Sequence, residues 1–155
     1  MESSKTALDP ARLSAWRALS SAQAVLSAQV ELGLADEELP PPRWFDVLAA
    51  LDAAESNQLR PRDLNCHVAL TKSGLTRLLD RLVEAGLIER HACETDRRGH
   101  YVELTDAGRE MLGRMSPVYE RALAESFGTD LSSDEVETLA GLLFRARPAP
   151  PPEDD

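Results

Sequence analysis

The sequence predicts a mainly α-helical fold with a small β component (α+β), organised as a winged helix-turn-helix with further helices at both ends. Leucine and alanine are abundant and only 5% of the 155 residues are aromatic, which is typical of helices that pack through aliphatic faces. Two helical segments meet at a turn around Leu70-Thr71, and two short alternating runs flank a polar turn soon after them. Helix, turn, helix and hairpin in this order predict a winged helix.

The first helix is expected from Asp9 to about Glu31, where apolar residues recur at helical spacing. Asp9 can cap this helix, and Pro10 suits its first turn because a backbone N–H is not needed there. Gly33 and the prolines at 40–42 are expected to end the helix and to separate it from the next one.

Three further helices are expected before the hairpin. The second covers 42–54 with a broad apolar face, and a short third covers 60–69. Thr71 can cap a fourth helix over 72–85, which Gly86 ends. The apolar face of this fourth helix follows the i, i+3, i+4, i+7 pattern through Leu75, Leu78, Leu79 and Leu82.

The hairpin is expected from two short strand-like runs, 87–92 and 100–104. The segment 93–99 between them is polar and charged, as the loop of a hairpin usually is. The second strand is expected to end at Thr105, which is a good cap for the helix that follows.

The C-terminal third is expected to add two helices. Thr105 caps a fifth helix over 106–124, and Pro117 is expected to bend it because proline removes one backbone hydrogen bond. A sixth helix begins at Ser132-Ser133-Asp134-Glu135. The proline-rich, acidic segment 148–155 is expected to be disordered.

Charge is distributed unevenly along the chain. The formal net charge is -10, which argues against a protein that coats nucleic acid or an anionic membrane. Between residues 60 and 101, however, eight Lys or Arg face six Asp or Glu, whereas the rest of the chain has 9 basic and 21 acidic residues. The segment 60–101 is therefore a mildly basic middle between acidic ends.

The outward face of the fourth helix is a candidate for reading DNA. Once the leucines are assigned to the core, the positions left outside are Lys72, Ser73, Thr76, Arg77, Asp80 and Arg81. Such a set suits a helix in the major groove, with its N-terminal turn at the base edges and its arginines at bases or phosphates. The alternative is an ordinary solvated helix face.

The tip of the hairpin is a second candidate. Arg97 and Arg98 could enter the minor groove beside the major groove that the helix occupies. Asp96 could pair with a guanidinium and hold the loop in shape. Without the helix, a charged tip of this kind is more often a solvated turn, but the two features together favour DNA binding.

A family resemblance rests on Asp96-Arg97-Arg98, Val102, Leu104-Thr105 and Gly108, preceded by Leu82 and Gly86-Leu87-Ile88-Glu89-Arg90. These residues resemble the signature DxRxxxVxLT, after a GLIxR strand, of the MarR family of bacterial transcriptional regulators. The match is close over about 59–112, and the helix order outside that range is compatible with it.

The resemblance implies a homodimer that binds a pseudo-palindromic operator in double-stranded DNA, with one winged helix on each half-site. It divides the chain into a dimerisation helix with its linker (1–40), the DNA-binding domain (41–104), C-terminal dimerisation helices (105–147) and a tail (148–155). The apolar surface available for pairing includes Trp16, Leu19, Leu26 and Val30 at one end and Leu123, Phe127, Leu131, Leu139, Leu142 and Leu143 at the other. Packing within one chain is the alternative.

Members of the family are often released from DNA by small, frequently aromatic ligands, and the sequence does not identify one. Trp16, Trp44 and Phe45 could line such a pocket, although aromatic residues at helical spacing are more often core residues. Arg43 could serve as an anion partner or be solvated.

Oxidation of a cysteine is a second possible way to regulate DNA binding. Cys93 lies near several basic residues at the base of the hairpin, so oxidation of its thiol could disturb DNA reading, with an inert thiol as the alternative. Cys66 is expected to be buried. The histidines and cysteines show no metal-ligand spacing, and no cofactor or enzyme motif is present.

The sequence therefore predicts a cytoplasmic, non-enzymatic regulator, a repressor by the habit of the family, without a membrane span or signal peptide. A thiol-responsive regulator and a winged-helix protein-interaction module that does not bind DNA are the alternative functions.

Overall fold

The structure is a computed structural model that describes residues 9–68, 70–92 and 99–146. Within these ranges the elements are α1 (Pro10–Asp36), α2 (Pro42–Ala53), β1 (Gln58–Leu59), α3 (Pro61–Val68), α4 (Lys72–Glu84), β2 (Ile88–Ala92), β3 (His100–Leu104), α5 (Asp106–Ser126) and α6 (Ser133–Ala146). The expected winged-helix order, mainly α with a small antiparallel sheet, is confirmed.

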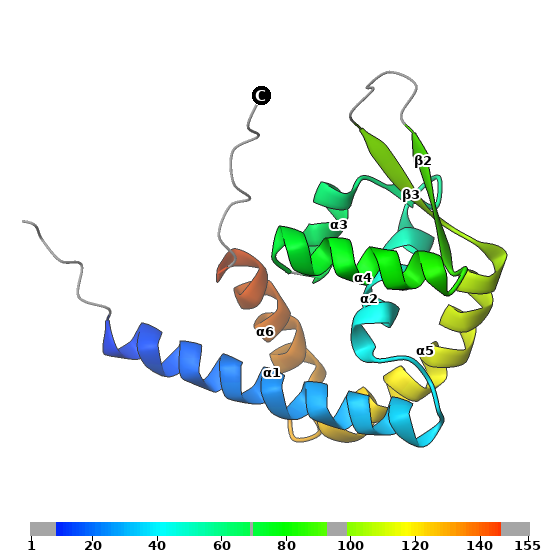
Figure 1. Cartoon of the computed structure of the whole chain (residues 1–155). Helices are drawn as coiled ribbons and strands as arrows, with labels where there is room; N and C mark the ends of the chain where they lie inside the picture. Colours follow the sequence, from blue (N-terminus) through cyan, green and yellow to red (C-terminus); the bar gives the residue numbers. More distant parts are fainter. Residues whose placement is uncertain (1–8, 69, 93–98, 147–155) are drawn as a thin grey trace, which may run out of the picture.

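The chain has two layers (Figure 1). The long helix α1 and the C-terminal half of α5 run along one side, and α2, α3, α4 and the sheet lie above them. The β2–β3 hairpin, which we call the wing, points away from α1. We call α1, α5 and α6 the body; the described N-terminus lies at the free end of α1, whereas α6 rises to the level of α4.

The sheet has the order β1-β3-β2 and is antiparallel throughout. In the wing, Ile88 pairs with Leu104 and Ala92 with His100. The two-residue strand β1 was not expected from the sequence, because two residues are too short to show an alternating pattern. It adds a third strand by pairing Gln58 with Glu103.

The hydrophobic core lies between α2, α3, α4 and the base of the wing and continues to the facing sides of α1 and α5. The α4 leucines predicted to face inward are all buried, and so are Leu48, Leu51, Leu64, Ile88 and Val102. Burying a leucine or valine side chain completely contributes about 1.5–3 kcal/mol, so this cluster is what holds the winged helix together.

Local hydrogen bonds begin the helices where the sequence predicts them. The side chains of Asp9, Thr71 and Thr105 accept from backbone N–H groups of the first turns of α1, α4 and α5. At α6, Glu135 reaches back and accepts from the N–H of Ser132 at 2.9 Å. This bond lowers the pKa of the Glu135 carboxyl, as expected of a capping box.

Two helix boundaries differ from the expectation. Helix α1 does not end at Gly33 but continues to Asp36, because Gly33 lies against Val118 and Ala122 of α5, and this packing outweighs the local cost of a glycine. Helix α5 passes through Pro117, as expected, and ends at Ser126, two residues beyond the expected end. The expected disordered tail, 148–155, lies outside the described residues.

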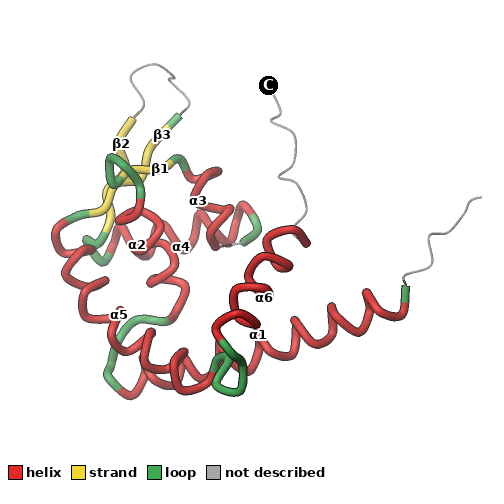
Figure 2. Tube along the Cα trace, turned by 180° about the vertical axis from the view of Figure 1, so that it is seen from behind, coloured by secondary structure: helices red, strands yellow, loops and turns green. Residues whose placement is uncertain are grey.

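Two parts of the body are poorly covered by the rest of the chain. None of the α6 residues is buried, and the N-terminal half of α1 extends beyond the other elements (Figure 2). Large apolar side chains are exposed there, including Trp16 at 63% and Phe144 at 71%.

The junction between the wing and α5 is unusually tight. A Cβ on Gly108 would lie 2.1 Å from the Leu87 carbonyl oxygen and 2.7 Å from Cδ1 of Leu104. The Thr105 hydroxyl accepts from the Gly108 N–H and donates to the Gly86 carbonyl. Only glycine allows the first turn of α5 to approach the start of β2 this closely.

We therefore expect Gly108→Ala to lower the free energy of unfolding by on the order of 2 kcal/mol, because the added methyl group forces backbone apart. Gly113→Ala is the matched control on the same helix, since no atom lies within 4 Å of its ideal Cβ. That control should be neutral or gain up to about 1 kcal/mol from helix propensity. Equal chemical denaturation midpoints for the two variants would contradict this account.

Candidate nucleic-acid interface

Helix α4 presents one continuous exposed face. The buried leucines fix its rotation about its own axis, and the side chains left on the outside are those predicted: Lys72, Ser73, Thr76, Arg77, Asp80 and Arg81. The Thr71 side chain accepts from the Gly74 N–H at 3.1 Å, so the helix begins at a defined residue. A defined start fixes which side chains the first turn presents.

The turn between α3 and α4 is held by side chain to backbone hydrogen bonds. Asn65 accepts from the Leu70 N–H at 3.0 Å, across the end of α3. The Arg43 guanidinium, from the start of α2, donates to the carbonyl of Val68 at the end of α3. These contacts set the angle between the two helices of the helix-turn-helix.

The wing stands beside α4 and is joined to it by an ion pair. Arg90 on β2 contacts Asp80 on α4, with a nitrogen to oxygen distance of 2.6 Å. Four residues singled out from the sequence, Asp96, Arg97, Arg98 and Cys93, lie outside the described residues.

The opposite face of the wing is acidic. Glu103 accepts from Gln58 at 3.0 Å, and Nε2 of His91 lies 2.9 Å from Glu103 and 3.6 Å from Glu89. Because side chains alternate along a strand, these residues point away from the side that carries Arg90. Within the described strands, the side of the wing toward α4 is therefore better suited to a polyanion than the acidic side.

An open depression of about 240 Å³ lies between the start of α2 and α4. Its walls are Pro41, Arg43, Trp44, Leu70, Gly74, Arg77, Leu78 and Arg81. The Arg81 guanidinium lies 6.0 Å from the centre of the Trp44 ring, at the outer limit of a cation–π contact. Trp44 Nε1 is buried without a hydrogen-bond acceptor among the described residues. The depression thus combines three cationic groups with an aromatic wall.

The three aromatic residues proposed to form a ligand pocket do not meet in the described chain. Trp44 lines the depression, whereas the Phe45 ring stacks on Tyr119 with centroids 4.0 Å apart. Burial raises the pKa of Tyr119 and that of the adjacent Asp46. Trp16 is exposed on α1 and lines neither depression.

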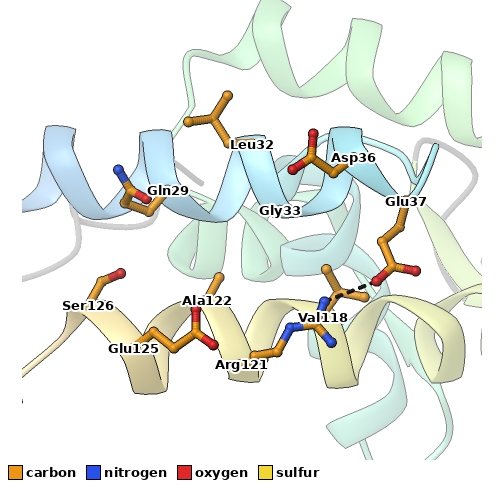
Figure 3. Close-up of a pocket in the computed structure, with 10 residues that line it drawn as sticks. All are labelled: Gln29, Leu32, Gly33, Asp36, Glu37, Val118, Arg121, Ala122, Glu125 and Ser126. Atoms are coloured by element: carbon orange, nitrogen blue, oxygen red, sulfur yellow. Dashed lines mark hydrogen bonds and ion pairs between the residues drawn. The ribbon is translucent and has the colours of Figure 1, made fainter.

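A larger open depression, of about 550 Å³, lies between α1 and α5 (Figure 3). Asp36, Glu37 and Glu125 make its walls acidic, and Arg121 pairs with Glu37 at 3.0 Å across it. The exposed side chain of Leu32 lies at its edge. It suits an anion less well than the first depression does, because carboxylates outnumber its single arginine.

Cys66 corrects one sequence expectation. It is exposed on α3, not buried, because the inward positions of this short helix are taken by Leu64 and Val68. Among the described residues, no group of three His, Cys, Asp or Glu side chains could hold a metal ion. No helix in the described ranges is long and apolar enough to span a membrane.

Sequence reasoning missed the contacts that depend on tertiary geometry. The Asp80–Arg90 pair and the approach of Arg81 to Trp44 join residues whose spacing carries no periodic signal. An aspartate among the outward-facing arginines of the fourth helix was the one available sign, since a carboxylate there can pair with a nearby cation.

The fold and the exposed face of α4 define a winged helix-turn-helix protein. A sequence model described as MarR family matches residues 39–99. Over 104 residues the chain is 33% identical to the multiple antibiotic resistance protein MarR of Escherichia coli, covering 67% of this chain and 71% of that protein. The chain therefore belongs to the MarR family.

Two further relatives show how far the likeness extends. The chain is 30% identical to the transcriptional repressor MprA of Escherichia coli over 95 residues, which are 61% of this chain and about half (53%) of MprA. The structure of Sco3205, a MarR family transcriptional regulator from Streptomyces coelicolor in complex with DNA, has a TM-score of 0.78 at 25% identity, covering 89% of this chain and 86% of that one. Membership of a family of transcriptional regulators supports the expected regulatory, non-enzymatic role.

Proposed function

We propose that the protein is a transcriptional repressor that binds a pseudo-palindromic operator as a homodimer. The observation that carries the proposal is the exposed, arginine-bearing face of α4 beside the wing, in a chain of the MarR family. A relative named as a repressor and a structural neighbour that was crystallised with DNA support it. Acting on the chromosome of a bacterium would place the protein in the cytoplasm.

In this proposal α4 enters the major groove. Its first turn, with Lys72, Ser73 and Thr76, reaches base edges, while Arg77 and Arg81 contact guanines or phosphates. The wing follows the neighbouring minor groove with Arg97 and Arg98, and Asp96 holds the loop, as the family resemblance implies.

Arg77→Ala tests the major-groove role. Losing a base or phosphate contact should weaken binding to the promoter DNA beside the protein's own gene by about 10-fold or more, at unchanged thermal stability. If the contact is to a phosphate, the slope of log affinity against log salt should also fall by about 0.9.

Arg114→Ala is the matched control, because it removes one exposed arginine from α5 instead of α4. Fluorescence anisotropy across a salt series measures all three proteins. Equal affinity of the Arg77 variant and wild type would contradict the assignment, and DNA affinity without salt dependence would favour the protein-interaction module.

The proposed dimer uses the uncovered apolar side chains of the body. They are Trp16, Leu19, Val25 and Leu32 on α1, Phe127 and Leu131 after α5, and Leu142 and Phe144 on α6. A monomer rarely exposes so many large apolar groups, so we assign 1–40 and 105–147 to dimerisation and 41–104 to DNA binding.

Leu142→Glu should therefore shift the protein from dimer to monomer, because a carboxylate would be buried in an apolar contact. Light scattering coupled to size exclusion gives the mass directly. Glu137→Gln, on the same helix, alters charge but no apolar surface and should stay dimeric. Unchanged dimerisation of the Leu142 variant would remove α6 from the interface.

A small aromatic anion is the proposed effector, and the depression beside Trp44 is its proposed site. Arg43, Arg77 and Arg81 supply positive charge there, and the Trp44 ring supplies an apolar wall. Two of these arginines also belong to the DNA-reading face, so an anion in the depression would compete with DNA for them.

Salicylate, as a simple aromatic carboxylate, should release the protein from promoter DNA in a concentration-dependent way. Arg43→Gln should raise the salicylate concentration needed by several-fold, and the DNA affinity of the variant without salicylate is measured alongside because Arg43 also donates to the Val68 carbonyl. Release that is insensitive to this variant would place the effector elsewhere. Reversible release by peroxide that Cys93→Ser abolishes would favour the thiol-responsive alternative.

A further inference from the structure

We propose that the Asp80–Arg90 ion pair is a positioning contact that aligns the wing with the recognition helix, so that both elements meet the same DNA duplex. The inference rests on the proposed function and adds two residues that act through others rather than by touching a base. Arg90 and Asp80 are ten positions apart, at 2.6 Å between Nη2 and Oδ1.

The backbone places the two side chains opposite one another. Arg90 pairs in register with Val102, whose side chain is fully buried, so Arg90 also points to the core side of the sheet. At this register position Val102 on β3 is in the core, whereas the Arg90 side chain on β2 is exposed and has α4 beside it. Asp80 is the α4 residue that meets it.

The pair lies at the outer edge of the hydrophobic contacts that hold the wing, level with the buried Val102. At the base, Leu87, Ile88 and Leu104 are buried, whereas His91, Ala92 and His100, farther out, are exposed. A small rotation about the base would move the outer wing by a larger distance. A contact between Arg90 and α4, two residues beyond Ile88, therefore limits this rotation more effectively than one at the base.

Stability alone does not explain the pair. The Arg90 and Asp80 side chains are 36% and 49% exposed, and ion pairs at such exposure contribute little to folding because water and salt screen them. Asp80 also lies between Arg77 and Arg81 in sequence, on the exposed face, where an unpaired carboxylate would repel phosphates. Pairing with Arg90 offsets that repulsion as well as fixing the wing.

A double-mutant cycle on the full-length dimer tests the proposal with promoter DNA as the probe. Asp80→Ala and Arg90→Ala should each lower affinity by about 5- to 10-fold, and the double variant should lose no more than either alone, because one contact is removed in all three. The reversed pair, Asp80→Arg with Arg90→Asp, should recover affinity to within about 3-fold of wild type.

Two further readouts separate positioning from other roles. Thermal unfolding should be unchanged, and the salt slope of the Asp80→Ala variant should equal that of wild type, because no phosphate contact is lost. Arg90→Lys, which keeps the charge, should retain most of the affinity. If an alanine variant fails to fold, Asp80→Asn and Arg90→Gln, which keep the side-chain size, replace it.

Other outcomes would overturn the proposal. If Asp80→Ala binds DNA as well as or better than wild type while Arg90→Ala reduces the salt slope by about 0.9, Arg90 is itself a phosphate contact. Additive losses in the cycle, or wild-type affinity in all variants, would also reject it. A wild-type protein that does not bind the DNA at all would instead overturn the proposed function, and this inference with it.

Discussion

The close approach of α5 to the start of β2 is the constraint on which the placement of the functional elements depends. The Thr105 hydroxyl joins the Gly86 carbonyl to the first turn of α5, and Gly108 leaves room for the backbone of Leu87. The end of α4, the base of the wing and α5 therefore meet at one rigid junction. Since α5 packs along α1, this junction transmits the orientation of the body to the DNA-facing elements.

Acidic and basic side chains lie on different surfaces of this protein. The chain is strongly acidic as a whole, and carboxylates line both the outer face of the wing and the depression between α1 and α5. Arginines gather along α4 and at the start of α2. Such an arrangement limits the orientations in which a polyanion can approach, which favours orientation-specific over indiscriminate binding.

The elements that the sequence predicted correctly are those encoded by neighbouring residues. Thr71 with the α4 leucines, and Thr105 after the alternating wing strands, specify start, face and end within a few positions. The features that the sequence did not predict depend on contacts between residues far apart in the chain. Gly33 stays helical because α5 packs on it, and β1 exists only because Glu103 offers an edge to Gln58. For the candidate site, the exposed face of α4 was predictable from periodicity, whereas the partners of Asp80 and Trp44 required the fold.

Helix α6 has a consequence for how the protein reaches its folded state. With no buried residue of its own, it gains little from contacts within the chain, and a 14-residue helix is marginal in isolation. In the proposed assembly its order would come from a second molecule. Helix α6 would then fold only when two chains associate. The folded fraction of α6 would depend on the protein concentration in the cell, so at low concentration the chain would lack an ordered α6.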